Sequence, residues 1–476
     1  MIRFLLNETL VELRDTPSDT TVLDYLRGNH SHNPDRKSGT KEGCCSGDCG
    51  ACTVVVAEPE NDRLNYQTIN ACIALLPALN GKQLITVEDL AEGEKLHPVQ
   101  QAMVDHHGSQ CGFCTPGIIM SLFAFHHEAP ENRPDIPEAL GGNLCRCTGY
   151  QSIVDAADEI ASLTPSDRFK HQEQETVEKL NALQARLDNT ANGVFMPDSE
   201  QALADYLLQH PQARLLAGGT DLGLEVTQQM KDLPSLVTLT SVNELKEISC
   251  SDREMIIGSA ASFRQLEPLL ARHFPEFAEM LSRLGSQQIR NVGTLGGNIG
   301  NASPIGDTPP VLLALDAEVE LRKGNTIRSL PLEDFFLDYK KTLLEESEFI
   351  ARIRIPLKPH QLRVYKLSKR YGDDISAVLA AINLELNDNG IITRARVAFG
   401  GMAAIPKRAL ACEKALTGKE ASATTLQEVQ KAIRSEFTPL SDVRGSSDYR
   451  LQAACNLLER YFLEMSGQTA RIIAHA

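Results

Sequence analysis

The chain has 476 residues, room for about three domains, and its 42% hydrophobic and 23% charged residues are ordinary for a soluble globular protein. Its formal net charge of −16 argues against a nucleic acid or an anionic membrane as partner, and no stretch reaches the roughly 18 apolar residues of a membrane span. The N-terminus turns polar at Asn7, too early for a signal peptide, so we expect a cytoplasmic protein. In that compartment groups of cysteines indicate metal binding or catalysis rather than disulfides.

The first predicted elements form a small sheet with one crossing helix. Residues 2–14 have the pattern of a hairpin that turns at 7–9, residues 21–27 that of a helix, and residues 53–57 that of a β-branched strand. This order predicts a ferredoxin-like β-grasp domain.

Three cysteines lie in the loop before that strand. Cys44, Cys49 and Cys52 have the C-x4-C-x2-C spacing that plant-type ferredoxins use for a 2Fe–2S cluster, and Cys72 is a candidate fourth ligand. Glycines among them suit a loop that bends tightly and turns backbone N–H groups toward sulfur. Zinc is the alternative, but its usual spacing is two short cysteine pairs. The spacing therefore favours an iron–sulfur site.

Two further cysteine pairs each stand just before a predicted helix. The pairs are Cys111 with Cys114 and Cys145 with Cys147. The helices predicted here cover residues 98–107, 117–127 with Thr115 as N-cap, and 152–161. A cluster held by four thiolates is anionic, and positive helix N-termini with free N–H groups stabilise it. We therefore predict a second 2Fe–2S cluster in a helical domain.

The middle of the chain combines a polar segment with two glycine-rich runs. Residues 162–193 are mostly polar, and we interpret them as a linker that docks one amphipathic helix. The glycine-rich runs, 218–223 and 290–307, lack the strand–GxGxxG–helix order of a Rossmann unit. Such loops can clamp a pyrophosphate through backbone N–H groups, and a pair of tight turns is the alternative. Strands over 377–386 and 391–399, followed by helices, predict a smaller α+β subdomain.

Together these motifs resemble the iron–sulfur and flavin subunit of the xanthine dehydrogenase branch of the molybdenum hydroxylases. The resemblance rests on residues 43–53, 110–117, 142–150, 215–223 and 292–307. It implies an α+β multidomain chain. Its expected parts are a ferredoxin-like β-grasp 2Fe–2S domain (1–88), a four-helix 2Fe–2S domain (89–164), a linker (165–190), an FAD-binding domain of the PCMH/VAO type (191–361) and a C-terminal α+β flavoprotein subdomain (362–476).

The resemblance also assigns cofactors to residues. It implies one cluster at Cys44, Cys49, Cys52 and Cys72 and the other at Cys111, Cys114, Cys145 and Cys147. It implies FAD at Leu215, Leu216, Ala217, Gly218, Gly219, Thr220, Asp221, Leu222, Leu284, Thr294, Leu295, Gly296, Gly297, Asn298, Asn301, Ser303, Asp307, Ile350 and Lys366. Two positions depart from the family: Cys45 replaces the usual glycine, and Leu284 replaces an aromatic residue that covers the flavin in animal members.

The implied function is electron transfer. A partner molybdopterin subunit would oxidise hypoxanthine and xanthine to urate, and electrons would pass through both clusters to FAD and then to NAD+. The family's molybdopterin half has no counterpart before Ala476, so the resemblance implies a separate large subunit, in a heterotetramer of two pairs. Gln110 would face the pterin, and Tyr339, Asp373 and Asp374 would lie near the nicotinamide.

Other functions remain open at this point. The chain has the features expected of the equivalent subunit of an aldehyde or N-heterocycle oxidoreductase, and also of a stand-alone NADH:acceptor reductase. A redox-sensing regulator is a third alternative, which the acidic charge and the lack of a basic DNA-binding element disfavour.

Overall fold

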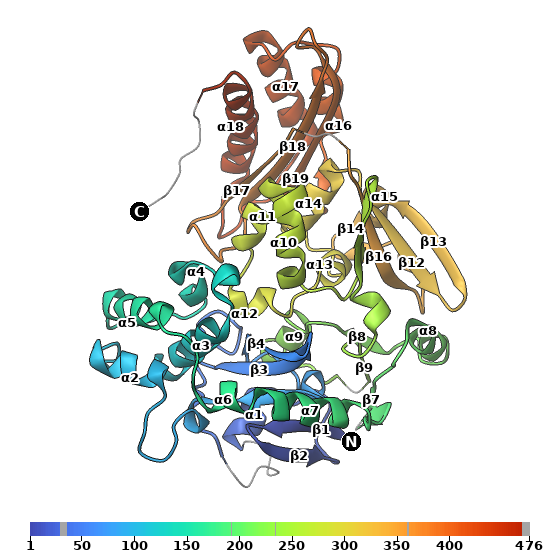
Figure 1. Ribbon diagram of the computed structural model, residues 1–476. Coiled ribbons are helices and arrows are strands. Elements are labelled where there is room, and N and C mark those ends of the chain that lie inside the picture. The colour runs from blue at the N-terminus through green and yellow to red at the C-terminus, as the bar shows by residue number, and fades with distance from the viewer. Residues whose placement is uncertain (29–35, 192, 234, 359–360, 469–476) are drawn as a thin grey trace. The chain divides into compact units, whose positions relative to one another are not determined.

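The computed structural model describes residues 1–28, 36–191, 193–233, 235–358 and 361–468 (Figure 1). The chain divides into two compact units. Unit 1 comprises residues 1–203, 212–243 and 285–293, and unit 2 comprises residues 204–211, 244–284 and 294–476. Among the described residues, no helix is long and apolar enough to cross a membrane.

A five-stranded sheet begins unit 1, with strand order β2-β1-β5-β3-β4. Its strands are β1 (Ile2–Leu6), β2 (Thr9–Leu13), β3 (Thr53–Glu60), β4 (Arg63–Asn70) and β5 (Gln83–Ile85). The helix α1 (Val22–Arg27) begins after Thr21, whose hydroxyl accepts the N–H of Asp24. The predicted hairpin, helix and strand are confirmed. The sheet is completed by β5, which pairs in parallel with β1 and antiparallel with β3.

Helical segments occupy much of the chain from the end of β4 to residue 162, with β5 after the first of them. They are η1 (Leu76–Leu79), η2 (Val87–Asp89), α2 (Pro98–Asp105), α3 (Thr115–His127), η3 (Pro130–Asn132), α4 (Ile136–Leu140) and α5 (Gln151–Ser162). Proline stands in the first turn of α2, α3 and α4, where its missing N–H costs no hydrogen bond. The prediction of Thr115 as N-cap is wrong, because Cys114 occupies the cap position and the Thr115 hydroxyl lies 2.7 Å from that of Ser109.

The polar segment after α5 contains α6 (Arg168–His171) and α7 (Glu173–Gln184). Val177 and Leu180 of α7 are buried in the same hydrophobic core as α3 and α5, which confirms the predicted amphipathic helix.

The rest of unit 1 is a small sheet of order β6-β7-β9-β8 with two short helices. These elements are β6 (Thr190–Ala191), β7 (Val194–Phe195), β8 (Arg214–Leu216), β9 (Leu236–Thr238), α9 (Leu222–Thr227) and α12 (Gln287–Arg290). The boundary between the residues of unit 1 and those of unit 2 falls within the helix α8 (Glu200–Gln209), after residue 203.

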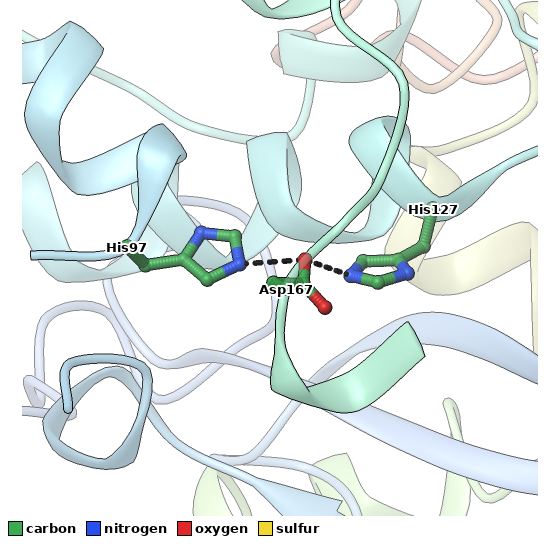
Figure 2. Close-up of side chains that lie close together, drawn as sticks. All are labelled: His97, His127 and Asp167. Atoms are coloured by element: carbon green, nitrogen blue, oxygen red, sulfur yellow. Dashed lines mark hydrogen bonds and ion pairs between the residues drawn. The ribbon is translucent and has the colours of Figure 1, made fainter. Parts of the chain in front are cut away.

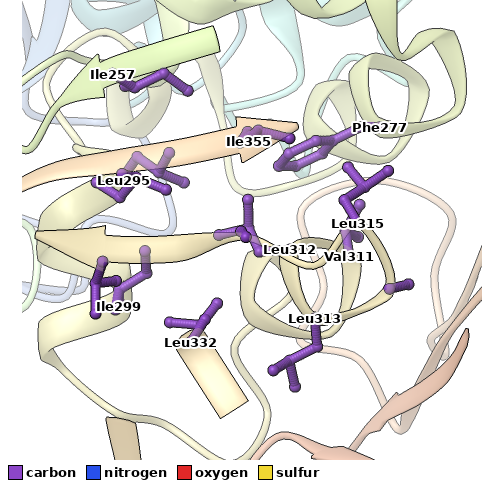
Figure 3. Close-up of a cluster of buried hydrophobic side chains, with 14 of the residues drawn as sticks. Ile257, Phe277, Leu295, Ile299, Val311, Leu312, Leu313, Leu315, Leu332 and Ile355 are labelled. Carbon is purple, nitrogen blue, oxygen red and sulfur yellow. The ribbon is translucent and has the colours of Figure 1, made fainter. Parts of the chain in front are cut away.

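Unit 2 contains an antiparallel sheet of order β10-β11-β16-β12-β13. The strands are β10 (Ile248–Cys250), β11 (Glu254–Gly258), β12 (Glu318–Lys323), β13 (Thr326–Pro331) and β16 (Phe349–Pro356). The other elements are η4 (Asn243–Leu245), α10 (Phe263–His273), α11 (Pro275–Ser282), α13 (Leu295–Gly300), α14 (Thr308–Ala314), α15 (Leu332–Phe335), β14 (Phe336–Asp338) and β15 (Lys341–Thr342). Figure 3 shows side chains of the sheet, such as Ile257 and Ile355, in one buried cluster with Leu295, Ile299 and Leu312 of the helices.

A second sheet of unit 2, β17-β18-β19-β20, has its own core. It comprises β17 (Leu362–Leu367), β18 (Val378–Leu386), β19 (Ile392–Gly400) and β20 (Lys407–Arg408), followed by α16 (Leu410–Leu416), α17 (Ala423–Glu436) and α18 (Ser447–Met465). The two predicted strands and the helices after them are confirmed.

Candidate functional site

The first cysteine loop brings its predicted ligands together. Hydrogen bonds from Cys49 and then Cys72 lower the pKa of the Cys44 thiol, and a hydrogen bond from Cys72 lowers that of Cys52. Backbone N–H groups point at the sulfurs: those of Ser46 and Cys49 lie 3.5 and 3.4 Å from Cys44 Sγ. The N–H of Cys72 lies 3.4 Å from Cys52 Sγ. Converging thiols with N–H donors fit a cluster whose sulfurs carry negative charge.

Cys45 has a different environment from its neighbours. Its backbone lies in the left-handed region, with φ of 52°. Its Sγ lies 3.3 Å from Glu42 Oε1, and burial with that hydrogen bond raises the pKa of the Cys45 thiol to about 11. A left-handed residue here explains why glycine suits this position. The direction of the side chain favours Cys44 as the ligand.

The second group of cysteines forms two contacts between the predicted pairs. A hydrogen bond links the thiols of Cys111 and Cys147, and another links those of Cys114 and Cys145. Burial and the second of these bonds raise the pKa of Cys114 to about 12. Cys145 is buried, whereas Cys111 and Cys147 are exposed.

The helices of this region meet the cysteines at their N-termini. Cys114 is the N-cap of α3, and Cys147 lies three residues before Tyr150, the N-cap of α5. The Tyr150 hydroxyl accepts the N–H of Cys145 across 2.9 Å and so ties this loop to the start of α5. The donor set and both helix ends therefore fit a second anionic 2Fe–2S cluster.

The first glycine-rich loop lies in unit 1, between β8 and α9. A Cβ on Gly218 would lie 1.8 Å from the Val292 carbonyl oxygen, and one on Gly223 would lie 2.2 Å from that of Ile73. Gly219 has φ of +71°. Glycine is therefore required for close backbone packing here, and part of that packing is on the residue that follows Cys72.

The second glycine-rich loop lies in unit 2, at α13. The Thr294 hydroxyl accepts the Gly297 N–H across 3.1 Å and caps the helix. A Cβ on Gly296 would lie 2.5 Å from Ser259 Cβ, while Asn298 Oδ1 accepts the Thr308 hydroxyl across 2.6 Å. In both loops the atoms nearest these glycines belong to the protein, so the close packing requires glycine, and the phosphate cradle remains a prediction.

Other predicted flavin residues form a buried polar group in unit 2. Lys366 Nζ lies 2.6 Å from Asp307 Oδ2 and donates to the Arg283 carbonyl oxygen across 2.9 Å. The Ser376 hydroxyl donates to Asp307 Oδ1 across 2.6 Å. Both carboxylate oxygens of Asp307 therefore bind protein groups. Ile350 is buried in β16.

Leu216, Leu222 and Leu295 are buried, whereas the remaining predicted residues are partly or fully exposed. Leu284 is half-buried beside the core of unit 2, and Asn301 and Ser303 follow α13 with partial exposure. Gln110 and Tyr339 are exposed. Hydrogen bonds from Arg370 lower the pKa of Asp374.

One group of side chains was missed by the sequence reasoning. Figure 2 shows His97 and His127 pointing at Asp167 from opposite sides, with each Nε2 2.9 Å from the same carboxylate oxygen. The ring of His127 is not aligned for a hydrogen bond, so its contact is an ion pair when that ring is protonated. Burial raises the pKa of Asp167, but the two imidazoles, His127 first, more than reverse this and lower it. The residues are 30 and 40 positions apart, a spacing that carries no motif.

Two histidines and a carboxylate have the composition of a metal site, but the hydrogen bonds favour another role. His97 Nδ1 accepts the Val99 N–H across 3.3 Å and caps α2. A neutral imidazole has one donor and one acceptor nitrogen, so Nε2 carries the hydrogen and donates it to Asp167. A metal at Nε2 would require an imidazolate ring. The group is therefore a buried clasp between α2, α3 and α6.

Four family models match the chain. A 2Fe–2S iron–sulfur cluster binding domain matches residues 4–76 and a 2Fe–2S binding domain matches residues 86–158. The FAD binding domain in molybdopterin dehydrogenase matches residues 188–358, and the CO dehydrogenase flavoprotein C-terminal domain matches residues 363–465. These matches confirm the predicted multidomain α+β fold with two 2Fe–2S domains and an FAD-binding domain.

Curated relatives match almost the whole chain. Xanthine dehydrogenase of Emericella nidulans is 32% identical over 98% of this chain, and xanthine dehydrogenase 1 of Arabidopsis thaliana is 31% identical over 95%. Xanthine dehydrogenase/oxidase of Rattus norvegicus is 29% identical over 98% of this chain. The chain spans 39% of the length of each of these relatives.

Solved structures match part of the chain. A chain of carbon monoxide dehydrogenase from Hydrogenophaga pseudoflava is 28% identical with a TM-score of 0.54, over 58% of this chain and 96% of that one. A chain of quinoline 2-oxidoreductase from Pseudomonas putida 86 is 28% identical with a TM-score of 0.54, over 59% of this chain and 99% of that one.

Proposed function

We propose that this chain is the electron-transfer portion of a xanthine dehydrogenase. The chain matches the 2Fe–2S and FAD portion of the molybdenum hydroxylase family. A molybdopterin centre on a partner subunit would oxidise hypoxanthine and xanthine to urate, and this chain would deliver the electrons to NAD+. The observation that carries the proposal is the convergence of eight thiols in two groups, on a chain that xanthine dehydrogenases match from end to end.

The cofactors would supply one-electron and hydride-transfer chemistry when bound. The residues of the chain hold and tune them. Cys44, Cys49, Cys52 and Cys72 would bind one cluster, and Cys111, Cys114, Cys145 and Cys147 the other. Backbone N–H groups at the first and the helix ends at the second favour negative charge. Residues 215–222 and 294–298 would bind FAD. The buried Lys366 and Asp307 are further candidates for the flavin site.

The proposed substrate class is supported by the domain arrangement of the relatives. The chains of carbon monoxide dehydrogenase and quinoline 2-oxidoreductase match 58% and 59% of this chain, whereas the xanthine dehydrogenases match 95% to 98%. The two solved chains are covered to 96% and 99% of their own length, so what separates them from this chain is the fusion of both 2Fe–2S domains to the FAD domain, which the xanthine dehydrogenases share and which supports a purine substrate. We also propose NAD+ as acceptor, cytoplasmic location and a heterotetramer of two pairs.

The test is to purify the chain alone and measure its cofactors and activities. We expect about four iron atoms from two clusters, together with one FAD. It should reduce artificial dyes with NADH and show no purine-dependent NAD+ reduction. Adding the cognate molybdopterin subunit should restore purine oxidation. Purine turnover without molybdenum would contradict the proposal, and full NADH-driven activity that no such subunit changes would favour a stand-alone reductase.

A further inference from the structure

The two cysteine loops are in direct backbone contact within unit 1. The Leu144 N–H, next to Cys145, donates to the Cys49 carbonyl oxygen across 3.0 Å. A Cβ on Gly50 would lie 2.0 Å from the Gly142 carbonyl oxygen, and one on Gly117 would lie 2.1 Å from that of Gly50. Main chain therefore packs directly on main chain where the two cysteine loops meet.

A buried polar network surrounds this contact. Asn143 Nδ2 donates to the Gly50 carbonyl oxygen across 3.0 Å and to Thr53 Oγ1 across 3.1 Å. The Thr53 hydroxyl donates to the same Gly50 oxygen, and the Ser121 hydroxyl donates to Asn143 Oδ1. The network therefore links the first cysteine loop, the start of β3, α3 and the second cysteine loop.

The centre of the network comes from a distant part of the chain. Gln288 of α12 is 1% exposed. Its Nε2 lies 3.1 Å from Asn143 Oδ1, 3.2 Å from Thr53 Oγ1 and 3.4 Å from Ser121 Oγ. Three acceptors around one NH2 group fix the orientation of the amide. A Cβ on Gly142 would lie 2.1 Å from Gln288 Oε1, so the oxygen of this amide packs closely against the second cysteine loop.

The neighbours of Gln288 anchor the same short helix. The Arg290 guanidinium binds the Glu138 carboxylate of α4 and donates to the Gly285 carbonyl oxygen across 2.7 Å. Asn291 Nδ2 donates to the carbonyl oxygen and hydroxyl of Thr68 in β4, across 2.9 and 3.1 Å. The short helix that carries Gln288 is thus held by α4 through Arg290 and by β4 through Asn291, while the Gln288 amide contacts Thr53 and Asn143 beside the two cysteine loops.

We propose that Gln288 is a positioning residue that fixes the separation of the two iron–sulfur loops. The inference rests on the proposed binding of a cluster at each cysteine group. Gln288 lies in the segment matched by the FAD-binding model, residues 188–358, yet its hydrogen bonds go to both 2Fe–2S segments. The flavin segment would therefore set the geometry along which the two clusters exchange electrons.

The experiment uses the full chain with Gln288→Met, which keeps the length of the side chain and removes its N–H donors, and Thr53→Val, which is isosteric. The matched control is Gln83→Met. Gln83 is equally buried in unit 1, but its Nε2 donates to the Asn7 carbonyl oxygen, away from both loops. The measurements are iron content, the reduction potential of each cluster, and the electron paramagnetic resonance splitting between the two reduced clusters, which falls with the inverse cube of their separation.

We expect both network variants to change the splitting and to shift at least one potential at unchanged iron content, while Gln83→Met keeps wild-type values. Loss of cluster iron from both network variants, with full iron in Gln83→Met, also supports the proposal. Wild-type splitting and potentials in iron-replete Gln288→Met would overturn it, as would equal iron loss in Gln83→Met. A wild-type chain without iron would instead contradict the proposed function.

Discussion

The thiol of Cys45 lies against the carboxylate of Glu42, with 3.3 Å between Sγ and Oε1, while the adjacent Cys44 faces the other cysteines. The two consecutive cysteines thus have different surroundings. The positive φ of Cys45 turns its side chain out of the ligand group.

Cys45→Gly should keep the full iron content and both cluster signals in electron paramagnetic resonance. Because glycine adopts the left-handed region without strain, the variant should be more stable by about 1 kcal/mol. The matched change Cys44→Ser should alter or remove one signal. Iron loss in Cys45→Gly with none in Cys44→Ser would reverse the assignment of the ligand.

Gly50→Ala should prevent iron loading at both cysteine groups, because the new Cβ would meet the Gly142 carbonyl oxygen at 2.0 Å. Gly149→Ala is the control. Gly149 has the same φ of +68°, but no atom lies within 4 Å of the new Cβ. Gly149→Ala should therefore lower the free energy of unfolding only by the left-handed strain of about 1–2 kcal/mol. Iron content and thermal unfolding are measured for both variants. Equal iron content and equal stability of Gly50→Ala and Gly149→Ala would show that close packing is unimportant at Gly50.

Gly297→Val should give flavin-poor protein if the loop at α13 binds FAD. A Cβ on Gly297 would lie 2.8 Å from Thr294 Oγ1, the hydroxyl that caps the start of the helix. Gly372→Val, in unit 2 with open space around its Cβ, is the control and should keep its flavin. Flavin absorbance per chain is the measurement. Full FAD occupancy in Gly297→Val would place the flavin elsewhere.

The stability of the helical 2Fe–2S region should fall as pH drops from about 6.5 toward 4. Burial, aided by His127, lowers the pKa of His126 to about 4, below the 6.5 of an unfolded histidine. The unfolded chain therefore binds this proton first as pH falls, and the contribution of neutral His126, about 3 kcal/mol, is present above pH 6.5 and lost on the way to 4.

Thermal unfolding followed between pH 4 and 7 tests this dependence. His126→Phe should flatten it, because the ring no longer binds a proton. His210→Gln, at an exposed histidine of unit 2, should leave it unchanged. Identical slopes for the wild type and His126→Phe would contradict the prediction.

The His97–Asp167–His127 clasp should respond to loss of its carboxylate but not to metal. Asp167→Asn replaces a charged acceptor for buried imidazoles and should lower stability by about 1.5–3 kcal/mol. Added zinc should leave the melting temperature of the wild-type chain unchanged, because the Val99 N–H already occupies His97 Nδ1. A zinc-dependent rise that Asp167→Asn abolishes would show that the group binds metal.

Local patterns were sufficient for the cysteine groups and most elements. Ligand spacing depends on how a short loop wraps a cluster, so the C-x4-C-x2-C motif in 43–53 pointed to its chemistry without tertiary information. Hydrophobic periodicity likewise located the hairpin at 2–14, α7 and the strands after Pro356. The N-cap of α3 shows the limit of this reasoning, because it lies one residue earlier than expected, so that Thr115 is the first residue of the helix and Cys114 its cap.

The tertiary structure alone decided which distant residues meet. Nothing in the sequence near Gln288 indicates that its amide reaches Thr53 and Asn143, which are 235 and 145 positions away. The same holds for β5 pairing with β1, and for Asp167 between two histidines. Spacing indicates chemistry where several ligands recur at short, fixed intervals, as in the cysteine loops. Contacts across the chain depend instead on how buried surfaces and hydrogen-bonding groups are satisfied together, which becomes defined only when the whole chain packs.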